Sequence, residues 1–139
     1  MTIMRPGRAG IALAAAILGG PAAAQPLDCA NAAAQVEMTA CAARAYEAAD
    51  AALNEAYAAA RDRARAADAV PAAGPQPAAP LADLLRDAQR AWIPFRDTAC
   101  GAEAGVYAGG SIANMVFLDC MSRLTRARTD DLAAFATER

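Results

Sequence analysis

The sequence predicts an all-α fold in which three helices, the first of them long, form one small disulfide-linked domain. Long stretches are rich in Ala, Glu, Arg and Leu, and no segment shows the apolar–polar alternation typical of a strand. Four cysteines provide an even number of disulfide partners. A chain of 139 residues is long enough for a single domain.

The first 24 residues have the pattern of a cleaved secretory signal peptide. Two arginines precede a short apolar run over residues 9–18, and three alanines follow a Gly-Gly-Pro break. A membrane-spanning helix needs about 20 apolar residues, which is more than this run provides. We therefore expect a mature domain at residues 25–139 that is periplasmic or secreted and makes no stable membrane insertion.

The first predicted helix covers residues 35–67, where helix-forming residues continue without Gly or Pro. Its apolar stripe is mostly alanine, which predicts a close approach to neighbouring helices. Residues 68–80 contain four prolines, and this composition predicts a Pro/Ala-rich connecting loop.

The second predicted helix runs from residue 81 toward residue 100. Pro94 cannot donate a hydrogen bond to the carbonyl of Arg90, so we expect the helix to kink or end early there. Its apolar stripe is expected to be buried, and consists of Leu81, Leu84, Leu85, Ala88, Trp92 and Phe95.

Four glycines break up residues 101–110, which predicts a ten-residue loop before a third helix. Ser111 is the expected N-cap of this helix, which should end near Ala136. Two exposed ion pairs are expected along it, Asp119–Arg123 and Arg126–Asp130.

The cysteines predict two disulfides, because their spacing lacks the close Cys-x-x-Cys pairs of most metal sites. A helix that begins near Gln35 places Cys41 about 9 Å along its axis, within reach of the preceding residues. The favoured pairing is therefore Cys29–Cys41 with Cys100–Cys120. The alternative is Cys41–Cys100 with Cys29–Cys120.

The mature sequence is mildly acidic and contains neither Lys nor His. It holds 11 arginines and 15 acidic residues, a net charge of −4, because the signal peptide contains two of the 13 arginines and no acid. The absence of His excludes Ser-His-Asp and Cys-His catalysis and most zinc sites. We expect no catalytic, cofactor-binding or metal-binding residues, no nucleic-acid partner, and compatibility with a basic protein partner.

Several strings of residues, in their order and spacing over about residues 29–135, resemble the LprI-like lysozyme inhibitor domain, a bacterial family. They are Gln35-Val-Glu-Met-Thr-Ala-Cys41, Asp50-Ala-Ala-Leu-Asn54-Glu-Ala-Tyr57, Gln89-Arg-Ala-Trp92-Ile-Pro-Phe-Arg96-Asp97-Thr-Ala-Cys100, Gly109-Gly-Ser111 and the string that begins at Cys120. The resemblance implies a secreted or periplasmic helical domain and, for some members, inhibition of lysozyme. This chain departs from the family at Ala34, where Ser or Thr would form a capping box with Glu37, and at Pro94.

Polar and aromatic residues of the first two helices predict a network between them, because polar groups in a thin core need partners. Arg96 is expected to be bound by Asp50 or Asp97. An acid/base pair of these two carboxylates is the alternative, and it lacks a nucleophile. Trp92 is interpreted as a core residue. The predicted network comprises Asp50, Asn54, Tyr57, Gln89, Trp92, Arg96 and Asp97.

The glycine-rich segment before the third helix is a candidate partner-binding loop. Its backbone N–H groups and hydroxyl could be presented to the paired carboxylates of a lysozyme cleft, and the residues concerned are Tyr107, Gly109, Gly110 and Ser111. A plain helix connector is the competing interpretation. For the whole chain, the hypotheses are an exported lysozyme inhibitor or a structural or adaptor module of the cell envelope, while the residue types present disfavour a hydrolase.

Overall fold

The computed structural model describes residues 27–71, 74–75 and 79–138, so the predicted signal peptide lies outside the described residues, as does part of the loop at 68–80. This part of the chain is folded into three α-helices and contains no strand. The predicted all-α fold with a long first helix is confirmed. The helices are α1 (Gln35–Asp68), α2 (Leu81–Gly105) and α3 (Ala113–Thr137).

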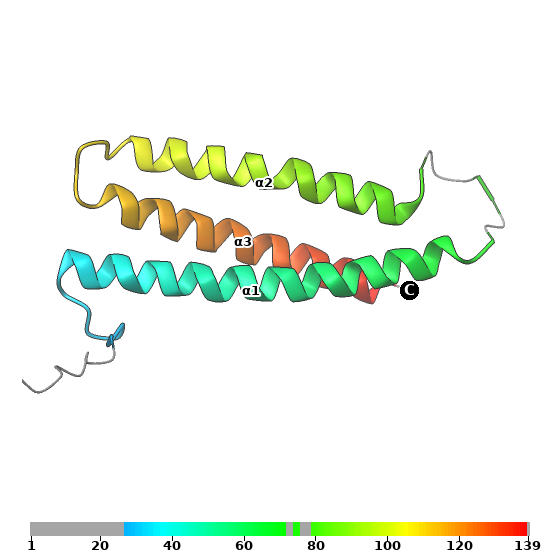
Figure 1. Ribbon diagram of the computed structural model, residues 1–139, viewed down its shortest axis with the longest axis horizontal. Coiled ribbons are helices and arrows are strands. Elements are labelled where there is room, and N and C mark those ends of the chain that lie inside the picture. The colour runs from blue at the N-terminus through cyan, green and yellow to red at the C-terminus, as the bar shows by residue number, and fades with distance from the viewer. Residues whose placement is uncertain (1–26, 72–73, 76–78, 139) are drawn as a thin grey trace, which may run out of the picture.

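The three helices lie lengthwise along one another (Figure 1). Helices α1 and α3 run in the same direction and form the most extensive helix pair, whereas α2 runs antiparallel to both and contacts each of them less. We call residues 27–52 and 94–125 the disulfide end, because they contain all four cysteines. The remaining described residues, near the 68–80 connection and the C-terminus, form the crossover end.

The core of the crossover end is aliphatic. Leu132 is only 1% exposed, and the alanines at 60 and 64 are fully buried beside it. Small side chains let helix backbones approach closely, as the alanine-rich stripe predicts. The buried cluster is Leu53, Ala60, Ala64, Leu85 and Leu132.

The core of the disulfide end is built around a buried disulfide. Cys100 and Cys120 are bonded to each other and pack against Met121. Cys29 and Cys41 form the second disulfide, which attaches the segment before α1 to the first turns of that helix. The favoured pairing is therefore confirmed, and the alternative pairing does not occur.

The predicted apolar face of α2 is wrong in part. Leu84 and Phe95 are 44% and 61% exposed, and Ala88 is exposed as well. The face that points inward instead carries Gln89 and Arg96, each 7% exposed. The helix has this rotation because the same face contains Cys100, which is bonded to α3, and because the buried polar groups find partners on the other helices.

Pro94 was predicted to kink the second helix or to end it early. The helix does not end there, because α2 continues through Pro94 to Gly105. Pro94 and Arg90 both lie on an exposed face, where water can satisfy the carbonyl that proline leaves without a donor. The predicted ten-residue loop therefore shortens to residues 106–112. Ser111 is not the N-cap of α3, since Ile112 takes that position without a side-chain cap.

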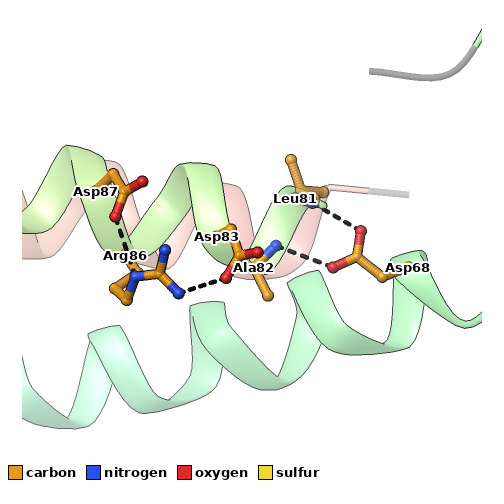
Figure 2. Close-up of polar contacts among 6 residues, drawn as sticks. All are labelled: Asp68, Leu81, Ala82, Asp83, Arg86 and Asp87. Atoms are coloured by element: carbon orange, nitrogen blue, oxygen red, sulfur yellow. Dashed lines mark hydrogen bonds and ion pairs between the residues drawn. The ribbon is translucent and has the colours of Figure 1, made fainter. Parts of the chain in front are cut away.

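The ends of α1 and α2 are capped in ways that the sequence analysis did not predict. Asp68, the last residue of α1, accepts hydrogen bonds from the N–H groups of Leu81 and Ala82 at 2.7 and 3.0 Å, and so caps α2 across the connection (Figure 2). At the start of α1, Glu37 accepts a hydrogen bond from the N–H of Ala34 at 3.1 Å. Ala34 has no side-chain acceptor, so only half of a capping box forms.

Candidate functional site

Arg96 lies in the disulfide end near its boundary with the crossover end, and its side chain contacts residues of all three helices. Its guanidinium carbon lies 5.1 Å from the ring centroid of Trp92 on α2 and 5.6 Å from that of Tyr46 on α1. Both rings are within the range of cation–π attraction, which strengthens as the cation loses water. Trp92 is half-buried and also packs against the aliphatic cluster of the crossover end.

The polar contacts of Arg96 also reach all three helices. Its Nε donates to Asp97 at 2.9 Å, and its Nη1 lies 3.8 Å from Asp50 of α1. The same nitrogen donates to the hydroxyl of Thr125 on α3 at 3.4 Å. Both carboxylates predicted as alternative partners thus contact the same guanidinium, an arrangement that compensates a buried charge.

The other predicted network residues divide between this cluster and its surroundings. Gln89 is buried and accepts a hydrogen bond from Nε of Arg128 at 3.0 Å. Asn54 is exposed and donates to Asp50 at 3.2 Å. Tyr57 does not join the network, because its ring lies under Arg61 in the crossover end.

Three members of the network were not predicted from the sequence. They are Tyr46, Thr125 and Arg128. Only Tyr46 had a detectable signal, since it lies four residues before Asp50 and therefore on the same face of α1.

The predicted ion pairs of α3 are corrected by the structure. Arg123 binds Glu103 of α2 at 2.7 Å, and no Arg126–Asp130 pair forms among the described residues.

The segment between α2 and α3 is a tight turn built on its two glycines. Gly109 has a φ of +83°, a conformation that glycine adopts without strain. The N–H of Gly110 donates to the carbonyl of Tyr107 at 2.9 Å, and a Cβ on Gly110 would lie 3.2 Å from that oxygen. The turn thus favours glycine at 109 by backbone conformation and at 110 by its close approach to the Tyr107 carbonyl, and it leaves Tyr107 and Ser111 exposed.

Exposed apolar side chains gather around this turn. Val106 is 80% exposed and Val36, at the start of α1, is 74% exposed. A shallow apolar groove between the first turns of α1 and α3 includes Val36 and Ser111 and extends to Leu118. Ser111 belongs to the predicted partner-binding loop, whereas the two valines were not predicted as a surface, because isolated valines beside a loop form no periodic pattern.

The disulfide end also carries most of the net negative charge of the described residues. The disulfide end contains seven carboxylate side chains and three arginines, whereas the described part of the crossover end contains eight and seven. At the outer edge, Asp28 accepts two hydrogen bonds, one from the side chain of Asn31 at 2.7 Å and one from the N–H of Ala30 at 3.0 Å. These hydrogen bonds, the one from Asn31 foremost, lower the pKa of Asp28, so this carboxylate stays charged.

The family model described as lysozyme inhibitor LprI matches residues 29–132. The chain belongs to this family. An uncharacterised protein of Rhizobium meliloti (strain 1021) is 36% identical to it over 105 residues, which cover 76% of each chain. The crystal structure of a DUF1311 family protein from Pseudomonas putida KT2440 covers 74% of this chain and 94% of its own, with a TM-score of 0.62 and 21% identity. That structure shares the fold.

Among the described residues of this LprI family protein, none of α1, α2 and α3 is both long enough and apolar enough to cross a bilayer.

Proposed function

We propose that this LprI family protein is exported and inhibits a lysozyme by binding it through the disulfide end. The observation that carries the proposal is the coincidence of three features at this end: a disulfide-enclosed turn, exposed apolar side chains and an excess of carboxylates. Apolar contacts surrounded by charged residues are typical of protein–protein interfaces. The family match supplies the kind of partner.

Charge supports this choice of face. Lysozymes are typically basic and cleave with paired carboxylates in an open cleft. Seven carboxylates against three arginines would draw a basic protein toward the disulfide end rather than toward the more balanced crossover end. The turn at 106–112 connects α2 and α3 at this end of the bundle (Figure 1), and in our proposal it enters such a cleft.

Export is part of the same proposal. Disulfides form and persist in oxidising compartments outside the cytoplasm, and both pairs of cysteines are bonded. Cleavage after residue 24 would release a chain that begins at Gln25. Sequencing the N-terminus of the protein recovered from outside the cytoplasm should find Gln25, and recovery of the intact chain from the cytoplasm would contradict export.

A structural or adaptor role in the cell envelope is the second candidate function. It is favoured by the outer side of α2, which leaves Leu84 and Phe95 exposed and uncovered by the other described helices. An adaptor would use this surface, whereas the proposed inhibitor uses the turn. The two functions therefore predict different effects of substitutions at the two places.

Matched charge substitutions separate the two functions. Val106→Arg places a cation on the proposed binding face, and Leu84→Arg places one on α2; both positions are exposed, so both variants should fold. We expect the wild-type protein to inhibit hydrolysis of a cell-wall substrate by a lysozyme. Val106→Arg should require at least about tenfold more protein for the same inhibition, and Leu84→Arg should behave as wild type. Absence of inhibition for every lysozyme class would refute the proposal. Loss of inhibition in Leu84→Arg alone would refute the proposed binding face.

A further inference from the structure

The crossover end contains a groove between α1 and α2 whose lining is rich in arginine. Arg61 and Arg65 of α1 line one wall, and Arg86 and Arg90 of α2 line the other. One carboxylate, that of Asp83, lies among them. In a mature chain with a net charge of −4, this is a local concentration of positive charge.

Two of these arginines are available to a ligand. Arg86 is bound by Asp83 and Asp87 (Figure 2), and its hydrogen bond to Asp87 is the main reason why its pKa is raised. Arg61 and Arg90 have no carboxylate within ion-pair distance among the described residues. Arg65 reaches Asp62 only at 3.9 Å, and both of those side chains are mostly exposed, so this pair is weak.

A buried amide also contributes a free donor to this groove. Gln89 lines it and is only 7% exposed. Its side-chain oxygen accepts from Arg128, which fixes its nitrogen as a donor, and that nitrogen has no hydrogen-bond partner among the described residues. Among the described residues only Ser122 Oγ is a fully buried side-chain polar atom without a partner, so the Gln89 nitrogen is accessible from solvent and an acceptor in the groove can reach it.

The spacing of the donors indicates an extended ligand. Asp68 caps α2 at Leu81, so the antiparallel helices place Arg65 near Arg86, and Arg61 near Arg90 one turn further along. Successive positions four residues apart on a helix rise by about 6 Å. Alternate residues of an extended peptide are about 6.6 Å apart and point the same way.

We propose that this groove binds an acidic segment of a partner protein, in extended conformation, with carboxylates on alternate residues. Guanidinium groups match the planar geometry of carboxylates and bind them with two parallel hydrogen bonds. The half-buried ring of Tyr57 and the exposed Ile93 add apolar contact within the same groove. This binding site lies away from the proposed lysozyme-binding turn and does not depend on it.

The test uses a fluorescein-labelled peptide of alternating Ser and Glu, with an alternating Ser and Gln peptide as control. Fluorescence anisotropy with the mature protein should show saturable binding of the acidic peptide only, weakened by added salt. Arg61→Gln/Arg90→Gln should lower the affinity at least about tenfold, the loss expected when charge-assisted hydrogen bonds are removed. Arg44→Gln/Arg126→Gln removes the same charge from exposed positions outside the groove and should change the affinity by less than about twofold.

Control measurements detect misfolded variants and distinguish an acidic protein segment from other anionic ligands. Circular dichroism should show wild-type helicity for both double variants, and Arg61→Lys/Arg90→Lys should bind with intermediate affinity, since it retains the charges without the planar fork. Absence of saturable binding, or equal losses in the two double variants, would overturn the proposal. So would displacement of the peptide by an equal concentration of inorganic phosphate, or tighter binding of soluble cell-wall stem peptides. Inhibition of lysozyme should be unchanged in Arg61→Gln/Arg90→Gln.

Discussion

The disulfide end and the crossover end of the bundle are stabilised by different interactions. At the disulfide end, a buried disulfide and a guanidinium between two aromatic rings connect the three helices. At the crossover end, Leu and Ala side chains form the core, and Asp68 caps α2 from the end of α1. The end that presents an exposed turn is thus the one with a covalent cross-connection between helices, whereas the other end combines aliphatic packing with hydrogen bonds between helices.

The cross-connections of the disulfide end suit it to hold an exposed turn rigid. A turn that must keep its shape while exposing apolar side chains loses less conformational entropy on binding if it is already rigid. The Cys100–Cys120 disulfide joins the two helices that flank residues 106–112, and Arg96 connects α2 to α1 and α3 further along the bundle. Substitutions at the two ends should therefore differ in size and in their effect on the turn.

The largest effect is expected from removing the buried disulfide. Cys100→Ser/Cys120→Ser should lower the free energy of unfolding by about 3–5 kcal/mol, from lost chain constraint and from placing hydroxyls in the core. Cys29→Ser/Cys41→Ser should cost about 1–3 kcal/mol, because Cys29 is exposed and its disulfide secures only the segment before α1. Urea denaturation of both variants measures the difference, and equal losses would show that the two disulfides are equivalent.

A slightly smaller loss is expected at the guanidinium. Arg96→Ala should reduce stability by about 2–4 kcal/mol, because two cation–π contacts, hydrogen bonds and side-chain packing are lost together. Arg96→Lys retains the charge but cannot reach Asp97, Asp50 and Thr125 with one planar group. We expect it to recover less than half of the loss, and full recovery would show that charge alone matters.

At the crossover end, the cap should have a moderate effect. Asp68→Ala should lower stability by about 1–2 kcal/mol, because the N–H groups of Leu81 and Ala82 lose their acceptor. Asp68→Asn retains an oxygen acceptor and should lose less. Amide hydrogen exchange over the first turn of α2 is the readout, and unchanged exchange rates there would exclude the cap as a source of stability.

A stabilising substitution is expected at the start of α1. Ala34 has the extended backbone conformation of an N-cap residue, and Glu37 already provides its half of a capping box. Ala34→Ser should therefore add about 0.5–1 kcal/mol. Thermal unfolding should shift upward by a few degrees, while Ala33→Ser, one residue earlier, serves as the control and should have no such effect.

The smallest effect is a local response to pH. The pKa of Asp28 lies below its ordinary value of 3.8 because the folded chain binds its charged form. The associated stabilisation is present above that value and is lost as the pH falls through the lowered pKa. The amide resonances of Ala30 and Asn31 should titrate below pH 3.8, and a midpoint above that value would contradict the assigned hydrogen bonds.

Sequence patterns predicted the helices and the disulfides because these depend on local composition and chain reach. The rotation of α2 could not be predicted in this way, since an apolar stripe through Leu84 and Phe95 competes with a polar one through Gln89 and Arg96. The Cys100–Cys120 disulfide and contacts with Tyr46 and Thr125, all involving the other helices, make the polar stripe the buried one. The exposed valines near the turn escaped prediction because they come together only in the folded bundle.

The most direct measurement of the central claim is a hydrogen-exchange footprint of the mature protein with a lysozyme that it inhibits. Our account predicts slower exchange in residues 106–112 and in the first turns of α1 and α3, with α2 between residues 84 and 95 unaffected. Protection confined to α2, or no protection at any segment despite inhibition, would contradict binding through the disulfide end.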